Sequence, residues 1–495
     1  MFLKKIIIKN LSFILLISLF FISFYLKSQL VKETAYGFYP DESRFGLLID
    51  GVQSYIAKNN ITEYLKTIFL LDARPGYGIL YFPVAYFIIK TQNPASIAGQ
   101  FYNAFLISLC TVFIFIIIKR LYNLLTGFLA SFFFLFSMSS YTYIRHMLPA
   151  DGALFFFLLS GVIYVFTRSL ILTGISVGLS FATHPGIYFY ITPLFVIFFP
   201  NFNLKNILRR IINFGGGVII TVILLEFISR ILGMKGTYIA TARGLSVSVN
   251  QGDFSPALFF FIDYVLANDG IFGIAILILG IFSLYNLYKN KNKNSSNKFF
   301  LFYTITTYIF LEMMSFIFHK TVLYGRTIRN FYILFFILAA IFIANFLSEN
   351  FKNKKINIFI NKKIITLLFI GLFLINWHTR FVQLKDNIYH KDFLIKINAI
   401  SLSPRNSKIE SIISFKGDPK DNSPYKIQNK GYFLLNTYLM YPYFGNKTIG
   451  CQKKILLKEK HALVSYEPYV FEGFSKEMRK SFKTDPPYYT LIYCR

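Results

Sequence analysis

Long apolar runs that alternate with short polar segments occupy the first three quarters of the chain. Most runs have roughly 18–22 residues, the length of α-helix that crosses the hydrocarbon core of a bilayer. This pattern predicts about eleven transmembrane helices in a polytopic α-helical membrane protein. The expected spans are residues 11–29, 97–118, 124–142, 153–167, 170–183, 187–200, 211–232, 270–288, 299–318, 331–348 and 364–377.

The polar segments between the spans differ in the sign of their charge, and this difference predicts the topology. With the N-terminus in the cytoplasm, the strongly basic segments 289–298 and 349–363 lie inside, as the positive-inside rule requires. The loops then expected outside carry Asp41, Glu42, Asp50, Glu63, Asp72, Asp151, Asp253, Asp263 and Asp269. An odd number of spans leaves the segment 378–495 outside as well.

The first apolar run has the basic flank of a signal peptide. It is long, and bulky residues follow it where a cleavage site would need small ones, so we expect a retained signal anchor rather than a cleaved peptide.

The first outside loop is long, covering residues 30–96, and its second half is apolar. Pro and Gly residues interrupt the stretch 70–90, which favours helices lying at the membrane interface over another span. The tyrosines expected at headgroup depth are Tyr77, Tyr81 and Tyr86.

The chain divides into two expected domains, a membrane module at 1–377 and a C-terminal extracytoplasmic domain at 378–495. The second is polar, rich in turn signals and contains short apolar segments typical of strands, so we expect a small α+β domain. Its two cysteines, Cys451 and Cys494, could form a disulfide or remain reduced thiols, whereas Cys110 lies in a span.

Composition excludes an ordinary soluble protein, because 55% of the residues are hydrophobic and only 15% are charged. The net charge of +29 would suggest nucleic-acid binding in a soluble chain, but here the basic residues lie mainly in the inside loops. No nucleotide-binding GxxxxGK, metal-binding CxxC or HExxH, or GxSxG nucleophile motif is present.

The octapeptide YPDESRFG at 39–46 places two adjacent acids just beyond the first span. The chain resembles the GT-C membrane glycosyltransferases, and in particular the branch of protein O-mannosyltransferases and lipid A aminoarabinose transferases, whose first outside loop carries a similar acidic pair. The matching elements are Asp41-Glu42-Ser43-Arg44-Phe45, then Arg74-Pro75-Gly76-Tyr77, Asp151 at the outer start of the fourth helix, VGLSFATHPG with His184, and RTIRNFYILFF.

The resemblance implies an inverting transfer of one sugar from a polyprenyl-phosphate donor to an extracytoplasmic acceptor, which could be a lipid, a glycan or a protein. It gives Asp41 the role of general base, with Glu42 as a candidate second catalytic acid. Arginines suit a leaving phosphate because their planar fork matches its oxygens. The candidate donor-phosphate ligands are Arg44, Arg74, Arg326, Arg329 and His184.

Other residues are candidates for lining the outer cavity: Asp151, Arg145, Glu312, Tyr77 and Tyr81. The sequence assigns no definite cofactor, but Asp41, Glu42 and Asp151 are hard oxygen ligands that could hold Mg²⁺ or Mn²⁺. Glu226 and Glu312 lie inside expected spans, where carboxylates are costly. Arg230, one turn later, is an expected ion-pair partner for Glu226.

We therefore expect a glycosyltransferase of a bacterial cytoplasmic membrane, with its active site facing the periplasmic side. The alternative is a secondary transporter or lipid flippase that uses intramembrane acids for ion coupling. Transporters favour internal repeats in matched halves, and no such repeat is evident in the sequence.

Overall fold

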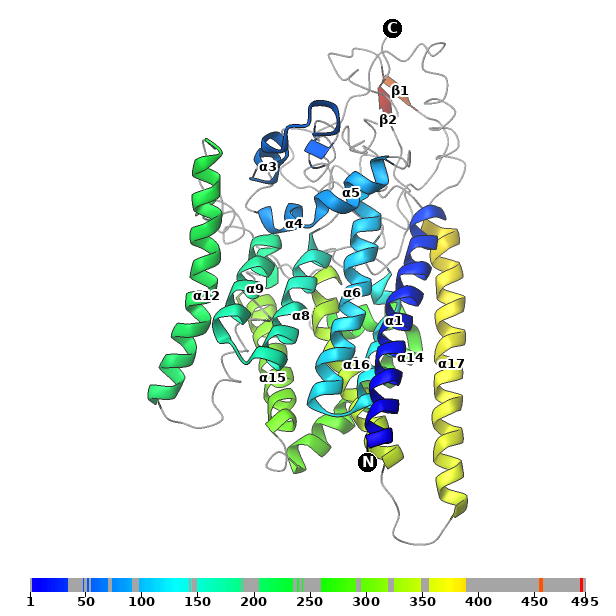
Figure 1. The fold of residues 1–495 in the computed structure, drawn as a ribbon. Coiled ribbons are helices and arrows are strands. Elements are labelled where there is room, and N and C mark those ends of the chain that lie inside the picture. The colour runs from blue at the N-terminus through cyan, green and yellow to red at the C-terminus, as the bar shows by residue number, and fades with distance from the viewer. Residues whose placement is uncertain are drawn as a thin grey trace.

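The computed structural model of the 495-residue chain is a bundle of long α-helices (Figure 1). It describes residues 2–33, 48, 51–52, 55–69, 74–90, 98–141, 144, 149–187, 190, 204–234, 238–239, 243, 260–290, 295–318, 325–348, 356–388, 454–456 and 490–492.

In chain order, the helices of the first half are α1 (Phe2–Glu33), α3 (Ile61–Phe69), α4 (Pro75–Ile79), α5 (Tyr81–Lys90), α6 (Ala98–Leu121), α7 (Leu124–Phe136), α8 (Ala150–Thr167) and α9 (Leu170–Thr183). The second half contains α12 (Leu204–Ile231), α14 (Phe260–Lys289), α15 (Ser295–Glu312), α16 (Gly325–Ser348) and α17 (Ile356–Ile388). The described residues also contain two 3₁₀ turns, Met138–Ser140 and Pro185–Ile187, a π-helical turn, Met313–Ile317, and helical residues at 48, 51–52, 55–58, 190, 238–239 and 243.

In the C-terminal segment, the described residues form an antiparallel pair of strands, β1 (Lys454–Leu456) and β2 (Thr490–Ile492). Strand β2 falls within YYTLIY, residues 488–493, one of the short apolar segments that were expected to form strands.

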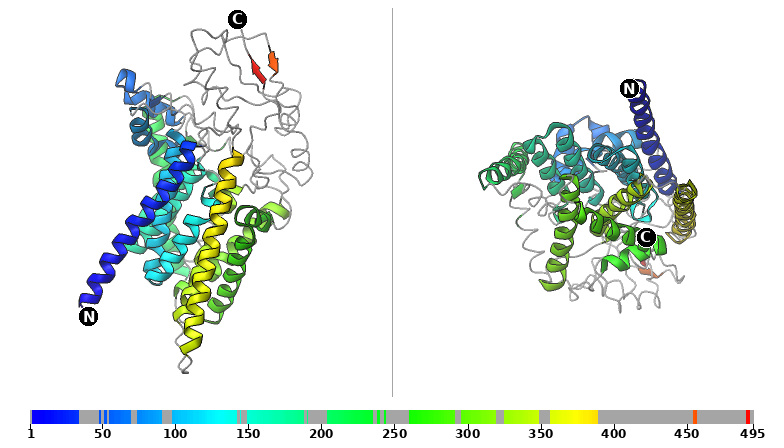
Figure 2. Two further views of the ribbon diagram at one scale, coloured as in Figure 1. Left: turned by 90° about the vertical axis from the view of Figure 1, so that its right-hand side faces the viewer. Right: turned by 90° about the horizontal axis from the view of Figure 1, so that it is seen from below.

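Helix α1 rises from the N-terminus at the bottom of Figure 1, and α3, α4 and α5 lie at the end that it reaches, which we call the upper end. Helix α17 also finishes at this end, beside α1 (Figures 1 and 2). The end of α14 and the start of α15, which both fall within the expected inside segment 289–298, lie at the opposite end (Figure 1).

Among the described residues, seven helices are long and apolar enough to cross a membrane. Their apolar spans are Asn10–Val31, Gly99–Leu121, Ala150–Thr167, Leu208–Ile231, Asn268–Lys289, Ile328–Ser348 and Ile364–Val382. Each overlaps a span expected from the sequence, so the prediction of a helical chain with several membrane-spanning helices is confirmed. The expected span 187–200 lies almost entirely outside the described residues.

Two expected spans form helices that are too short to cross the whole hydrocarbon core. Helices α7 and α9 have 13 and 14 residues, or about 20 Å, whereas the hydrocarbon core is about 30 Å thick. Helix α7 was expected to reach residue 142 but ends at Phe136. Ser137 has an extended backbone there, and its side chain accepts a hydrogen bond from the Ser139 N–H.

Helix α14 begins ten residues before the expected span and contains a kink. Gly270 has φ 61° and ψ −143°, which breaks the helical geometry where the span was expected to begin. Asp263 and Asp269 were assigned to an outside loop, but both are helical residues of α14. The segment 260–269 before the kink contains Asp263, Asn268 and Asp269 among apolar residues, and it is helical nevertheless.

Helix α16 occupies the centre of the bundle. From Ile328 to Ile341 nearly every side chain is buried, and the helix packs against α7, α8, α14, α15 and α17. Helix α12, by contrast, packs on α9 and exposes many of its apolar side chains. A methyl group on Gly217 of α12 would overlap the carbonyl oxygen of Ile171 on α9, so this glycine permits close approach of the two backbones.

Candidate functional site

A buried ion pair joins α8 to α16 at the upper end of the bundle. Asp151 lies in the first turn of α8, and Arg329 is the fifth residue of α16. The Arg329 Nη2 donates to Asp151 Oδ1, and the two side chains are 0% and 1% exposed. The sequence predicted Asp151 at the start of this helix and Arg329 as a candidate phosphate ligand. The structure brings them together across 178 positions of the chain.

A third charged side chain, Lys27 of α1, lies in the same buried region and was missed from the sequence. Its side chain is fully buried, and its ammonium donates to Ser23 Oγ at 2.9 Å. Asp151 and Arg329 are both within the range of its Coulomb interactions. Lys27 and Arg329 therefore belong to two different helices, and both interact electrostatically with Asp151.

Asp269 of α14 forms a second buried polar cluster. One carboxylate oxygen accepts the Ser137 hydroxyl at 2.6 Å and the other accepts the Met138 N–H at 2.7 Å. The Asp269 carbonyl accepts a hydrogen bond from Asn376 on α17 at 3.0 Å. These contacts fix the kinked part of α14 to the turn after α7 and to α17, so we assign Asp269 a structural role.

The expected interfacial segment forms two short helices, α4 and α5, that pack on α6. Arg74 immediately precedes α4 and is half-buried. The Tyr77 hydroxyl donates to Asn103 Oδ1 at 3.0 Å, and the Tyr102 hydroxyl donates to the Tyr77 carbonyl at 2.9 Å. Tyr77 and Tyr81 are both 0% exposed, so they contact protein, whereas contact with lipid headgroups was expected. The cause is the packing of both rings against Tyr102.

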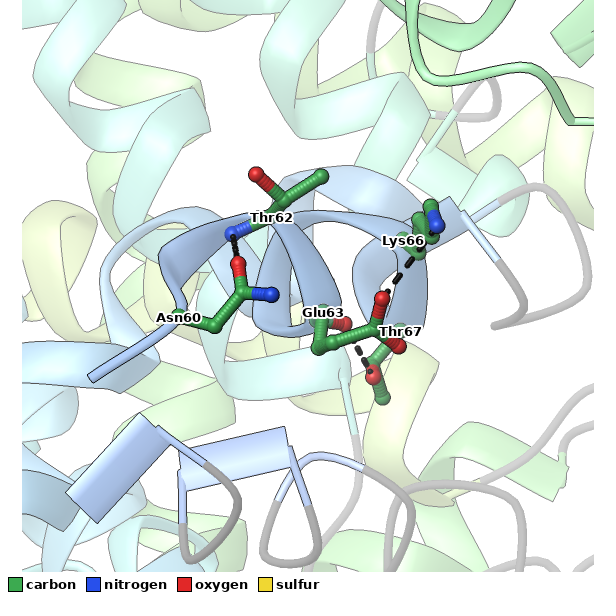
Figure 3. A network of polar contacts seen from close by, with 5 residues as sticks. All are labelled: Asn60, Thr62, Glu63, Lys66 and Thr67. Atoms are coloured by element: carbon green, nitrogen blue, oxygen red, sulfur yellow. Dashed lines mark hydrogen bonds and ion pairs between the residues drawn. The ribbon is translucent and has the colours of Figure 1, made fainter. Parts of the chain in front are cut away.

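Helix α3 covers α4 with an apolar face and presents a polar face to solvent. Its buried Tyr64 donates to the Gly78 carbonyl at 2.6 Å, and burial raises the pKa of Tyr64 well above its usual range. On the other face Glu63 and Lys66 form an exposed ion pair at 3.2 Å (Figure 3). Asn60 accepts the Thr62 N–H at 3.0 Å and so caps the start of the helix.

His184 is the residue that ends α9, as expected from its position before a proline. It is 8% exposed, and its Nδ1 accepts the Gly186 N–H at 3.1 Å. This hydrogen bond stabilises the 3₁₀ turn that follows the helix, so Nδ1 of His184 has a structural role.

Glu312, the last residue of α15, is half-buried and directly precedes the π-helical turn. Tyr308, one turn earlier, is the polar neighbour of its carboxylate. The sequence gave no partner for this acid, because a tyrosine was not considered as one. Glu226 pairs with Arg230 at 2.9 Å, as predicted.

Several sequence candidates lie outside the described residues: Asp41, Glu42, Arg44, Arg145, Cys451 and Cys494. Arg326 belongs to the first turn of α16, but its side chain is outside the described part. Within the described residues, no three His, Cys, Asp or Glu side chains are placed to hold a metal ion. The metal hypothesis depends on Asp41 and Glu42 together with Asp151, whose Oδ1 accepts a hydrogen bond from Arg329.

No family model matches the chain, and no curated protein sequence does. Among solved structures, the chain is similar to the oligosaccharyltransferase of the archaeon Archaeoglobus fulgidus in its apo form, with a TM-score of 0.50 and 13% identity. The match covers 79% of this chain and 58% of the transferase, so the chain spans little more than half of that protein's length.

Two further structures of the Archaeoglobus fulgidus enzyme match with lower scores. One is a complex with an inhibitory peptide and a dolichol-phosphate, with a TM-score of 0.47, 13% identity, and coverage of 79% of this chain and 58% of the other. The second is tethered to an acceptor peptide, with a TM-score of 0.46, 12% identity, and coverage of 79% and 57%. The likeness to the apo enzyme shows that this chain shares the fold of the matched part of that oligosaccharyltransferase.

Proposed function

We propose that the chain is an inverting glycosyltransferase that moves a sugar from a polyprenyl-phosphate donor to an acceptor outside the cytoplasm. The observation that carries this proposal is the GT-C fold together with the acidic pair Asp41-Glu42, which follows the first helix of that fold. In the reaction, an acceptor hydroxyl or amine attacks the anomeric carbon. The bond from that carbon to the phosphate oxygen breaks, its electron pair leaves with the lipid phosphate, and Asp41 takes the acceptor proton.

The connections of the loop support this assignment of Asp41. The residue comes eight positions after Glu33, the end of α1, and seven before Leu48, which is buried beside Gly78 of α4. An extended chain covers at most about 3.6 Å per residue, so Asp41 is restricted to within about 25 Å of Leu48. A position at the upper end of the bundle, where Asp151 and Arg329 lie, is therefore within reach of Asp41, which supports the proposal.

The cations at this end fit the needs of a phosphate leaving group, whose developing charge requires fixed positive groups. Arg329 is held rigidly by its ion pair with Asp151. We propose that Arg44, Arg74, Arg326 and His184 are further candidates for this role, and that Arg145, Glu312, Tyr77 and Tyr81 lie near the same cavity. Glu42 would assist Asp41.

The experiment that tests the proposal uses purified protein in proteoliposomes with a panel of radiolabelled polyprenyl-phosphate sugars, and it follows release of the lipid phosphate. Asp41→Asn should lower the turnover rate by about 10²–10⁴-fold, since it removes the general base. Glu63→Gln is the matched control, because Glu63 is an exposed acid of the same loop. Its activity should equal that of the unaltered protein.

Full activity of Asp41→Asn would contradict the role of Asp41. The transporter alternative would be favoured by two results together. The unaltered protein would transfer sugar from none of the donors, and the same vesicles would take up a solute in a proton- or sodium-coupled manner. The fold likeness supports the transferase in preference to a transporter.

A further inference from the structure

Lys27 is a fully buried lysine in a membrane-spanning segment. It lies four residues before the end of the apolar span Asn10–Val31. A lysine so close to a helix end usually extends its side chain toward the headgroups. Ser23, Lys27 and Leu30 instead form a fully buried face of α1. Tyr25, between them in sequence, is 62% exposed on the other side.

The contacts of the Lys27 ammonium use only part of its bonding capacity. An ammonium group has three N–H donors. One of them donates to Ser23 Oγ at 2.9 Å, and Ser23 Oγ is 3.4 Å from Thr111 Oγ1 on α6. The nitrogen also lies 4.4 Å from the centre of the Tyr141 ring, a cation–π contact.

The remaining donors of Lys27 require an acceptor. In the part of the chain that the structure describes, no carboxylate lies within ion-pairing distance of the ammonium, and Asp151 is already bonded to Arg329. A buried cation is costly unless it is paired and its donors are satisfied. The Coulomb neighbours of Lys27 include both members of the Asp151–Arg329 pair, so an anion near Arg329 would also be attracted by Lys27.

We propose that Lys27 binds the phosphate group of the lipid-linked donor and belongs to the same anion site as Arg329. This assignment rests on the proposed function, because it takes the ligand to be a polyprenyl phosphate. A phosphate monoester has several anionic oxygens and forms strong charge-assisted hydrogen bonds with an ammonium. Lys27 then stabilises the charge that develops on the leaving phosphate as the sugar is transferred.

The test measures equilibrium binding of decaprenyl phosphate to the full-length protein in detergent micelles, with decaprenol and inorganic phosphate as comparison ligands. The unaltered protein should bind decaprenyl phosphate more tightly than decaprenol. Lys27→Met should weaken binding of decaprenyl phosphate at least tenfold and leave decaprenol unchanged. Lys27→Arg, which keeps the charge, should retain part of the affinity. Lys90→Met is the matched control, since Lys90 is exposed and lies 4.8 Å from the Tyr86 ring.

Equal affinity of Lys27→Met and the unaltered protein for decaprenyl phosphate would overturn the proposal. If inorganic phosphate binds as tightly as decaprenyl phosphate, the ligand of the site is free phosphate, and the assignment to a lipid-linked phosphate is wrong. If Lys27→Met does not remain monodisperse, ³¹P–¹⁵N dipolar dephasing in unaltered protein labelled at lysine Nζ replaces it. Dephasing by bound decaprenyl phosphate supports a lysine contact, and its absence excludes one.

These outcomes are separate from those of the transfer assay. A protein that transfers sugar but is insensitive to Lys27→Met leaves the proposed function intact and removes Lys27 from the site. A protein that binds no polyprenyl phosphate and transfers no sugar refutes the proposed function itself.

Discussion

Replacing Asp151 by asparagine removes the charge from a buried ion pair with little change in side-chain size. Arg329 and Asp151 are 0% and 1% exposed, so water cannot replace the lost carboxylate. Opposite unit charges about 4 Å apart attract by about 4 kcal/mol at an effective dielectric constant of ~20. Removing one member of a buried pair costs about 3–5 kcal/mol, because the other charge stays buried. We therefore expect Asp151→Asn to destabilise the protein by about 3–5 kcal/mol.

The assay follows unfolding of the micelle-bound protein with increasing SDS. Trp377 is the single tryptophan of the chain, and its ring lies 5.0 Å from that of Phe136, so its fluorescence reports the packing of α17 on α7. Glu63→Gln is the matched control, since the Glu63–Lys66 pair has side chains 49% and 41% exposed. Exposed pairs contribute about 0–1 kcal/mol, so this variant should unfold almost as the unaltered protein does.

The single variant Arg329→Met and the double variant Asp151→Asn/Arg329→Met complete a cycle, and the double variant should lose less stability than the two single changes together. Equal unfolding midpoints for Asp151→Asn and Glu63→Gln would refute the reasoning. Strictly additive losses in the cycle would also refute it, because they would mean that the two side chains do not interact.

Two predictions concern glycines and use the same unfolding assay. Gly217→Ala should destabilise the protein by about 1–3 kcal/mol, because its methyl group would overlap the α9 backbone. Gly215→Ala and Gly216→Ala meet open space and should be neutral or stabilise α12 by up to about 1 kcal/mol; equal effects at all three positions would refute the assigned packing. Gly270→Ala should cost about 1–3 kcal/mol, because φ is 61° at the kink of α14. A neutral effect would mean that this backbone conformation is absent.

Much of the bundle is predictable from the sequence, because the positions and lengths of the apolar runs determine where membrane-spanning helices form. The same holds for local contacts: Glu226 and Arg230 lie one helical turn apart, and the predicted pair is present. The helix ends were less predictable, since they depend on single residues. Helix α7 ends before Ser137, six residues earlier than expected. Helix α14 begins ten residues earlier than expected and has a kink at Gly270.

Lys27 could have been found from the sequence by considering the polar positions of the first span together. Ser12, Ser23 and Lys27 are 11 and 4 residues apart, which places them within about 60° of one another at 100° per residue. All three are buried. Polar residues that share one face of a membrane-spanning helix usually face protein. Such a face predicts an inward lysine, although it does not identify what the lysine meets.

The partner of Arg329 illustrates what periodicity leaves undetermined. Helix α16 is apolar on all sides from Phe331 onward, which is typical of a helix enclosed by others, so an arginine near its start is expected to be buried. Burial then demands a counterion, but the choice of Asp151, 178 residues away, depends on how α8 and α16 pack. Sequence reasoning ranked Arg326 and Arg329 equally for the same reason. The sequence identifies buried charged side chains that require a counterion. Only the packing of the helices determines which of them form an ion pair.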